Sequence, residues 1–169
     1  MKKTIIALCF LPLAAFADNV NFVSLSHITL DDSFESVNAY SLGYQGVFNG
    51  TFAIALSHTE ILDDVCDGCD LKSLSMKFAI STFDEGSFYL GAGFNDGSDS
   101  NSQNGYSVGY AKINGDGLDY DVSAAVVEGV TAMGITLRAP IGDSGLGWQV
   151  GLSETNGITA SMAGVSMAF

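Results

Sequence analysis

Two cysteines lie three residues apart in an acidic segment of the chain. Cys66-Asp67-Gly68-Cys69 is a C-x-x-C motif, which can be a redox pair, half of a zinc site or a local disulfide. A redox pair needs a helix N-terminus that lowers the thiol pKa, and the sequence predicts no helix there. Zinc needs two further soft ligands, and the chain has no second cysteine pair. Because exported loops oxidise readily, we expect a disulfide between Cys66 and Cys69.

The same segment carries four aspartates that could bind a cation: Asp63, Asp64, Asp67 and Asp70. Carboxylate oxygens suit calcium or magnesium, ions that also bridge lipopolysaccharide phosphates. The spacing does not match an EF-hand loop, and an acidic loop that is simply solvated is the simpler explanation. Divalent cations are therefore kept as a hypothesis, and no metal site or cofactor is assigned.

Two histidines occur in a repeated Leu-Ser-His triplet, at residues 25–27 and 56–58. His58 could act with Ser57 or Ser26 and an acid such as Glu60 as a hydrolase or acyltransferase site. Adjacent residues of a strand point to opposite faces, however, so Ser57 and His58 cannot easily meet. A histidine near lipid headgroups is the simpler interpretation, and we expect no enzyme activity and no catalytic residue.

The chain begins with the pattern of a secretory signal peptide over residues 1–17. Lys2 and Lys3 precede an apolar run, and Ala15-Phe16-Ala17 fits the small-x-small cleavage pattern. We therefore expect one mature domain, residues 18–169. It keeps four basic residues against nineteen acidic ones, a net charge of −15, so it repels phosphate backbones and we expect no nucleic-acid binding.

Within the mature domain, apolar residues recur at every second position in ten segments, which is the period of a strand. Only the first segment, residues 22–30, is ambiguous, because its apolar residues fall in both phases. Long polar connections at 31–36, 60–70 and 96–105 alternate with short turns such as Asn49-Gly50. Long loops on one side and short turns on the other are the layout of an outer-membrane barrel.

The second face of these segments carries mostly small residues, which include Ser41, Gly43, Ala53, Ala55, Ser75, Gly91 and Gly93. A soluble sandwich or lipocalin-like barrel would carry charged residues on this face, because it would meet water. The crowded inside of a closed barrel instead favours small residues, with the large apolar side chains in lipid. We predict an all-β, closed antiparallel up-and-down transmembrane β-barrel of ten strands, with eight strands as the alternative.

The same alternation points four charged side chains into the lumen: Lys77, Asp119, Asp121 and Arg138. If Glu128-Gly129 is a hairpin tip, Asp119 lies across from Arg138 in a cross-strand ion pair, with Asp121 diagonal to it. These charges could simply neutralise one another inside the barrel. Alternatively they line a narrow aqueous path and bias it by charge.

The chain ends on Phe169, with Met167 and Val165 two and four places before it. This ending resembles the C-terminal signal of bacterial outer-membrane proteins. Together with the signal peptide and the alternation, it resembles the small OmpA-like and OmpX-like barrels. The resemblance implies a Gram-negative outer membrane, insertion by the barrel-assembly machinery through Val165, Met167 and Phe169, and contact with outer-membrane lipid and lipopolysaccharide.

Barrels of this kind have several functions, so the resemblance does not select one. We expect a structural or surface-interaction role first and a narrow porin-like channel for small solutes second. A lipid-active enzyme is a distant third. The oligomeric state stays open.

Overall fold

The computed structural model describes residues 20–31, 36–62, 69–98, 102–114 and 117–169. They form ten strands: β1 (Val20–Asp31), β2 (Ser36–Phe48), β3 (Phe52–Ile61), β4 (Asp70–Phe83), β5 (Gly86–Gly97), β6 (Gln103–Lys112), β7 (Asp119–Val127), β8 (Val130–Pro140), β9 (Leu146–Thr155) and β10 (Ile158–Ala168). In this described part of the chain no helix is long and apolar enough to cross a membrane.

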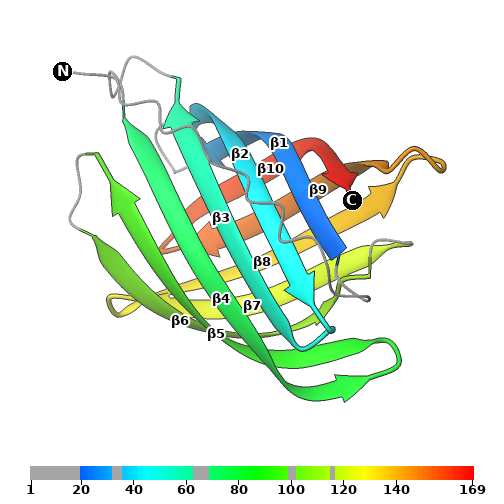
Figure 1. Cartoon of the computed structure of the whole chain (residues 1–169). Helices are drawn as coiled ribbons and strands as arrows, with labels where there is room; N and C mark the ends of the chain where they lie inside the picture. The colour runs from blue at the N-terminus through cyan, green and yellow to red at the C-terminus, as the bar shows by residue number, and fades with distance from the viewer. Residues whose placement is uncertain (1–19, 32–35, 63–68, 99–101, 115–116) are drawn as a thin grey trace.

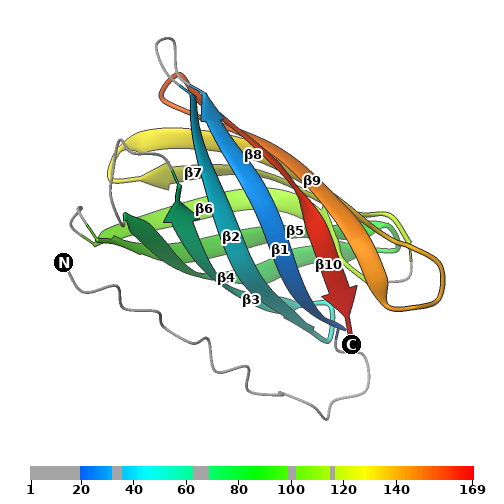
Figure 2. The same cartoon turned by 90° about the horizontal axis from the view of Figure 1, so that it is seen from above.

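Each strand pairs antiparallel with its neighbours in sequence, and β1 pairs with β10 to close the barrel. At this seam Leu25 lies opposite Val165, and the backbones of Asn21 and Phe169 exchange hydrogen bonds of 3.3 and 3.0 Å. Figures 1 and 2 show the tilted strands as one continuous wall, with the C-terminal end of β10 beside the start of β1. The ten-strand prediction is therefore confirmed, and the eight-strand alternative is wrong.

Tight turns connect several strands as the sequence predicts. Asn49-Gly50, Glu128-Gly129 and Asn156-Gly157 all have positive φ at both residues. This geometry belongs to two-residue hairpin turns whose twist matches that of the flanking strands, and Gly adopts it without a steric cost. We call the end of the barrel that carries turn 49–50 the short-turn end, and the end that carries the connections after β1, β3 and β5 the long-loop end.

Pairing with both neighbours settles the phase of β1, which its sequence leaves ambiguous. Ser24 lies opposite Gly43 of β2 and Ser26 opposite Gly164 of β10, so the even-numbered residues of β1 face the lumen. Phe22 is accordingly 3% exposed, whereas Leu25, on the other face, is 54% exposed. The two apolar phases of β1 therefore serve two different surfaces.

The outer surface of the barrel is apolar around most of its circumference. Nine strands contribute an exposed large apolar side chain: Leu25, Tyr40, Phe78, Leu90, Val108, Val122, Met133, Leu152 and Val165. A water-soluble monomer rarely exposes an apolar patch of more than a few hundred Å², so this belt needs an apolar environment.

Aromatic rings gather on the outside at the short-turn end. Phe52 lies between Phe48 and Phe78, with ring centroids 5.7 and 4.8 Å away. A second chain of rings runs through Phe83, Phe88, Tyr110 and Tyr120, with neighbouring centroids 4.9 to 6.0 Å apart. Girdles of this kind mark the membrane–water interface of transmembrane barrels. Tyr44, by contrast, is largely covered, and its hydroxyl donates to Asn21 Oδ1 at 2.8 Å.

Candidate functional site in the barrel lumen

The lumen contains a cavity of about 410 Å³ that touches every strand except β5 and β6. Its wall carries many hydroxyl groups, from Ser24, Ser41, Ser57, Ser75, Ser123 and Thr136. The four charged side chains that the sequence directs inward, Lys77, Asp119, Asp121 and Arg138, all line it. Small side chains create this space, because Gly, Ala and Ser on the inner face fill little of it.

Lys77 and Asp121 form an ion pair inside the barrel. Lys77 projects from β4 and Asp121 from β7, two strands that do not pair because β5 and β6 lie between them. Tyr89 of β5 donates a 2.7 Å hydrogen bond from its hydroxyl to Asp121 Oδ1, and the Lys77 ammonium lies 4.4 Å from the centroid of the Tyr89 ring. We call Lys77, Tyr89 and Asp121 the lumen triad.

Tyr89 was not among the predicted site residues, although the sequence contains a pattern that could have indicated it. Tyr89 is a large residue on a face of β5 that otherwise carries small ones, and it lies opposite Gly109 of β6. A Cβ atom at Gly109 would come within 2.5 Å of the Tyr89 hydroxyl. Gly109 therefore lets the ring lie against the barrel wall, where Tyr89 is 3% exposed.

Arg138 organises a second polar cluster in the lumen. Its Nη2 donates to Gln45 Oε1 at 3.2 Å and to Gln149 Oε1 at 3.4 Å, and Gln149 Nε2 donates to Ser26 Oγ. The guanidinium also stacks over the ring of Phe22, with its Cζ 4.0 Å from the centroid. Within the described part of the chain, Arg138 Nε is buried without a hydrogen-bond partner.

The register places Asp119 opposite Arg138, as the predicted hairpin requires. The Asp119 carboxylate also accepts a 2.9 Å hydrogen bond from the backbone N–H of Asn114. The expected position of Asp121, diagonal to Arg138, follows from the same register, but its carboxylate binds Lys77 and Tyr89. Closure of the barrel brings β4 and β5 within reach of β7, and hairpin geometry alone cannot reveal this.

A second cavity, of about 200 Å³, lies at the short-turn end beside Thr51, Asp84 and Asn114. It shares three lining residues with the lumen cavity: Ala53, Lys77 and Ile113. Lys77 is the one charged residue among these three. Its side chain therefore borders both spaces.

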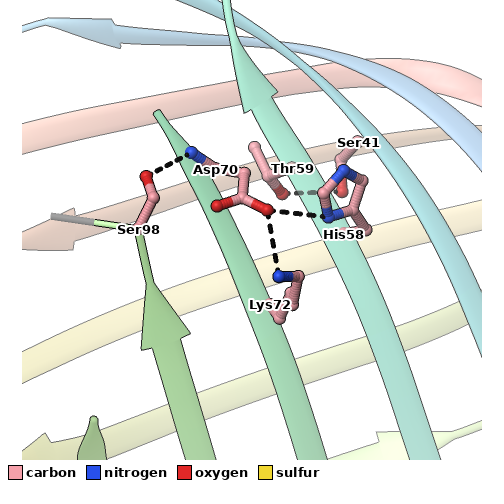
Figure 3. Close-up of polar contacts among 6 residues, drawn as sticks. All are labelled: Ser41, His58, Thr59, Asp70, Lys72 and Ser98. Atoms are coloured by element: carbon pink, nitrogen blue, oxygen red, sulfur yellow. Dashed lines mark hydrogen bonds and ion pairs between the residues drawn. The ribbon is translucent and has the colours of Figure 1, made fainter. Parts of the chain in front are cut away.

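A third polar cluster lies at the long-loop end, and Figure 3 shows it. Asp70 Oδ2 lies 3.2 Å from Lys72 Nζ and 3.8 Å from His58 Nδ1. The backbone N–H of Asp70 donates to Ser98 Oγ at 3.0 Å. His58 thus meets an acid from β4, while Ser57 lines the lumen cavity on the other face of β3. Ser26, the other candidate serine of the hydrolase hypothesis, also lines the lumen cavity.

The predicted cation loop and disulfide fall largely outside the described residues, which exclude Asp63, Asp64, Cys66 and Asp67. Asp70 is engaged by Lys72 and His58, and Cys69 is 7% exposed. Among the described residues, no group of three or more His, Cys, Asp or Glu side chains could hold a metal ion.

The residues of the predicted assembly signal lie together on the outer face of the barrel. Val165 and Met167 of β10 and the terminal Phe169 all have about half of their surface exposed. Because they are two residues apart in sequence, their side chains form one apolar row along the seam with β1.

No family model matches the chain, and no curated protein matches it. Among solved structures, a KdgM porin in complex with disordered oligogalacturonate is similar, with a TM-score of 0.53 and 11% identity over 88% of this chain and 99% of that one. A structure from the de novo design of transmembrane β-barrels gives a TM-score of 0.51 and 9% identity over 89% of this chain and 95% of that one. At these identities the likeness shows the fold, that of a transmembrane β-barrel.

Proposed function

We propose that this chain is a bacterial outer-membrane β-barrel protein whose lumen is a narrow passage for small solutes. The observation that carries the proposal is the polar cavity of about 410 Å³ inside a barrel whose outside is apolar. Polar inside and apolar outside is the arrangement of a barrel that holds water in a membrane.

The location is supported by three features of the chain. The exposed apolar belt needs lipid, and the closed sheet leaves no edge strand with unpaired backbone groups. The aromatic clusters at the short-turn end fit a membrane interface. The signal peptide predicted for residues 1–17 and the predicted assembly signal at Val165, Met167 and Phe169 fit export and insertion by the barrel-assembly machinery.

The passage is supported by how the lumen is filled. The inside of a barrel this narrow is only slightly wider than side chains can fill, and a purely structural barrel would gain stability by filling it. Here the inner wall carries serine, glycine and alanine, which leave the cavity unfilled. The KdgM porin of similar fold, solved in complex with an oligogalacturonate, is consistent with a transport role for such a barrel.

A surface-interaction role is the second candidate, and the cluster of His58, Asp70 and Lys72 favours it. These residues lie at the long-loop end, where a barrel meets lipopolysaccharide, and Lys72 offers a cation for its phosphates. A catalytic role has no comparable support, because His58 faces away from Ser57, and we propose a non-enzymatic protein.

Planar-bilayer recording of the refolded mature protein tests the passage. We expect discrete conductance steps that Ala55→Trp strongly reduces, because Ala55 lines the cavity and an indole ring would fill much of it. The matched control is Ile54→Trp, which adds the same ring to the lipid-facing side of β3 and leaves the conductance unchanged. A wild-type protein that folds but neither conducts in several salts nor admits a sugar into liposomes would refute the proposal.

A further inference from the structure

The Lys77 side chain lies where the lumen cavity meets the cavity at the short-turn end. Both cavities touch Lys77, Ala53 and Ile113, and only Lys77 has a side chain long enough to reach far across the lumen. Its ammonium is held by Asp121, on a strand that does not pair with β4. The ion pair therefore bridges two separate parts of the barrel wall at this junction.

The contacts of the lumen triad hold this bridge in one position. The Asp121 carboxylate accepts hydrogen bonds from both Lys77 and Tyr89, and the Tyr89 ring lies beside the ammonium. Gly109 in turn leaves the space that the Tyr89 ring occupies, since a Cβ atom at this position would lie within 2.6 Å of it. An unpaired lysine side chain would sample many positions in the lumen. The Lys77 side chain is instead held at its backbone by β4 and at its ammonium by Asp121.

The charges along the lumen cavity balance. Its lining contains two cations, Lys77 and Arg138, and two anions, Asp119 and Asp121. Lys77 pairs with Asp121, and Asp119 lies opposite Arg138 in the strand register. An ion entering the cavity therefore meets no net charge that would repay the loss of its water, whereas the hydroxyls and amides of the wall can bind an uncharged solute.

We propose that Lys77, paired with Asp121, is the specificity-determining residue of the passage. The pair separates the two cavities and keeps the lumen electroneutral, so the passage favours small uncharged polyhydroxy solutes, such as sugars, over ions of either sign. This inference rests on the proposed function and names the class of solute for it.

Single neutral substitutions at the two positions test the inference by leaving one lumen charge without its partner. Asp121→Asn frees the Lys77 cation, and Lys77→Gln frees the Asp121 anion. Under a KCl gradient, we expect a wild-type reversal potential near zero and shifts of opposite sign in the two variants. An uncompensated charge in a narrow lumen concentrates its counter-ion about tenfold or more, so the permeability ratio should change by about that factor.

Three further variants exclude simpler explanations. The double variant Lys77→Gln/Asp121→Asn restores neutrality, so its reversal potential should return to near zero while its conductance exceeds that of the wild type. Lys77→Arg keeps the charge and the bridge and should behave like the wild type. Glu154→Gln removes a charge at the exposed end of β9, outside the lumen lining, and should change neither quantity. A boiling-dependent gel shift confirms that each variant is folded.

Solute preference is measured by liposome swelling with arabinose, a neutral sugar, and with potassium gluconate. We expect the wild type to admit the sugar faster, and either single variant to lose part of that preference. A conducting wild type whose variants all share its reversal potential and swelling rates would overturn the inference and leave the proposed passage standing. Failure of every protein both to conduct ions and to admit the sugar would overturn both. A silent wild type with a conducting Lys77→Gln would support Lys77 as the barrier and refute a passage that is open at rest.

Discussion

An arginine at the middle of β1 should destabilise this barrel in a membrane by much more than a surface arginine would destabilise a water-soluble protein. Leu25 is five residues from Val20, where β1 begins, and it is 54% exposed. At about 3.4 Å per residue and a tilt of about 40°, it lies about 13 Å along the barrel axis, near the middle of an apolar band about 25 Å tall. Leu25→Arg should then cost about 2–4 kcal/mol, or roughly 30- to 700-fold in the folding equilibrium.

The matched control is Leu146→Arg, which changes the same residue type at nearly the same exposure but at a different depth. Leu146 is 50% exposed and is the first residue of β9, at the short-turn end. An arginine there can reach the headgroups, so it should cost about 0–1 kcal/mol. Urea titration of each variant in lipid vesicles, followed by circular dichroism and by the gel shift of the folded barrel, measures both free energies.

Equal costs at the two positions would refute the orientation of this barrel. In a water-soluble protein both leucines would be ordinary surface residues, and each substitution would change stability by about 0.5 kcal/mol or less. The difference in free-energy cost between the two depths, and not the sign of either change alone, distinguishes a barrel in a membrane from one in water.

Three further results are expected. Gly109→Ala should destabilise the barrel by about 1–3 kcal/mol through overpacking against the backbone carbonyl of Val122 and the Tyr89 ring, whereas Gly93→Ala, whose new methyl meets nothing closer than 3.6 Å, should not; urea titration compares the two. Oxidised mature protein should resist thiol alkylation at both Cys66 and Cys69 until it is reduced, as mass spectrometry would record, with little loss of stability because the closed loop is short; alkylation without reduction would contradict the disulfide. Deleting Phe169 should lower the amount of barrel in outer-membrane fractions, as immunoblotting would measure, and an unchanged amount would argue against the assembly signal.

The sequence was sufficient to predict the class and strand number of this fold. Alternation of large apolar and small residues is a local property, because successive side chains of a strand point to opposite faces of the sheet. Turn chemistry is local as well, so Asn49-Gly50 and Asn156-Gly157 predict their hairpins, and a turn at Glu128-Gly129 predicts the register that places Asp119 opposite Arg138. Because these features depend on neighbours in the chain, they can be read along it.

Closure of the barrel determined the phase of β1 and the contacts across the lumen. The phase of β1 became clear only when β2 and β10 paired with it, which sent Phe22 inward to lie under Arg138. The ion pair of Lys77 with Asp121 joins residues 44 positions apart on strands that do not pair, so neither hairpin register predicts it. Contacts across a lumen depend on the curvature of the whole sheet, and no local pattern carries that curvature. The sequence therefore determined which residues enter the barrel, and the tertiary structure determined which of them meet.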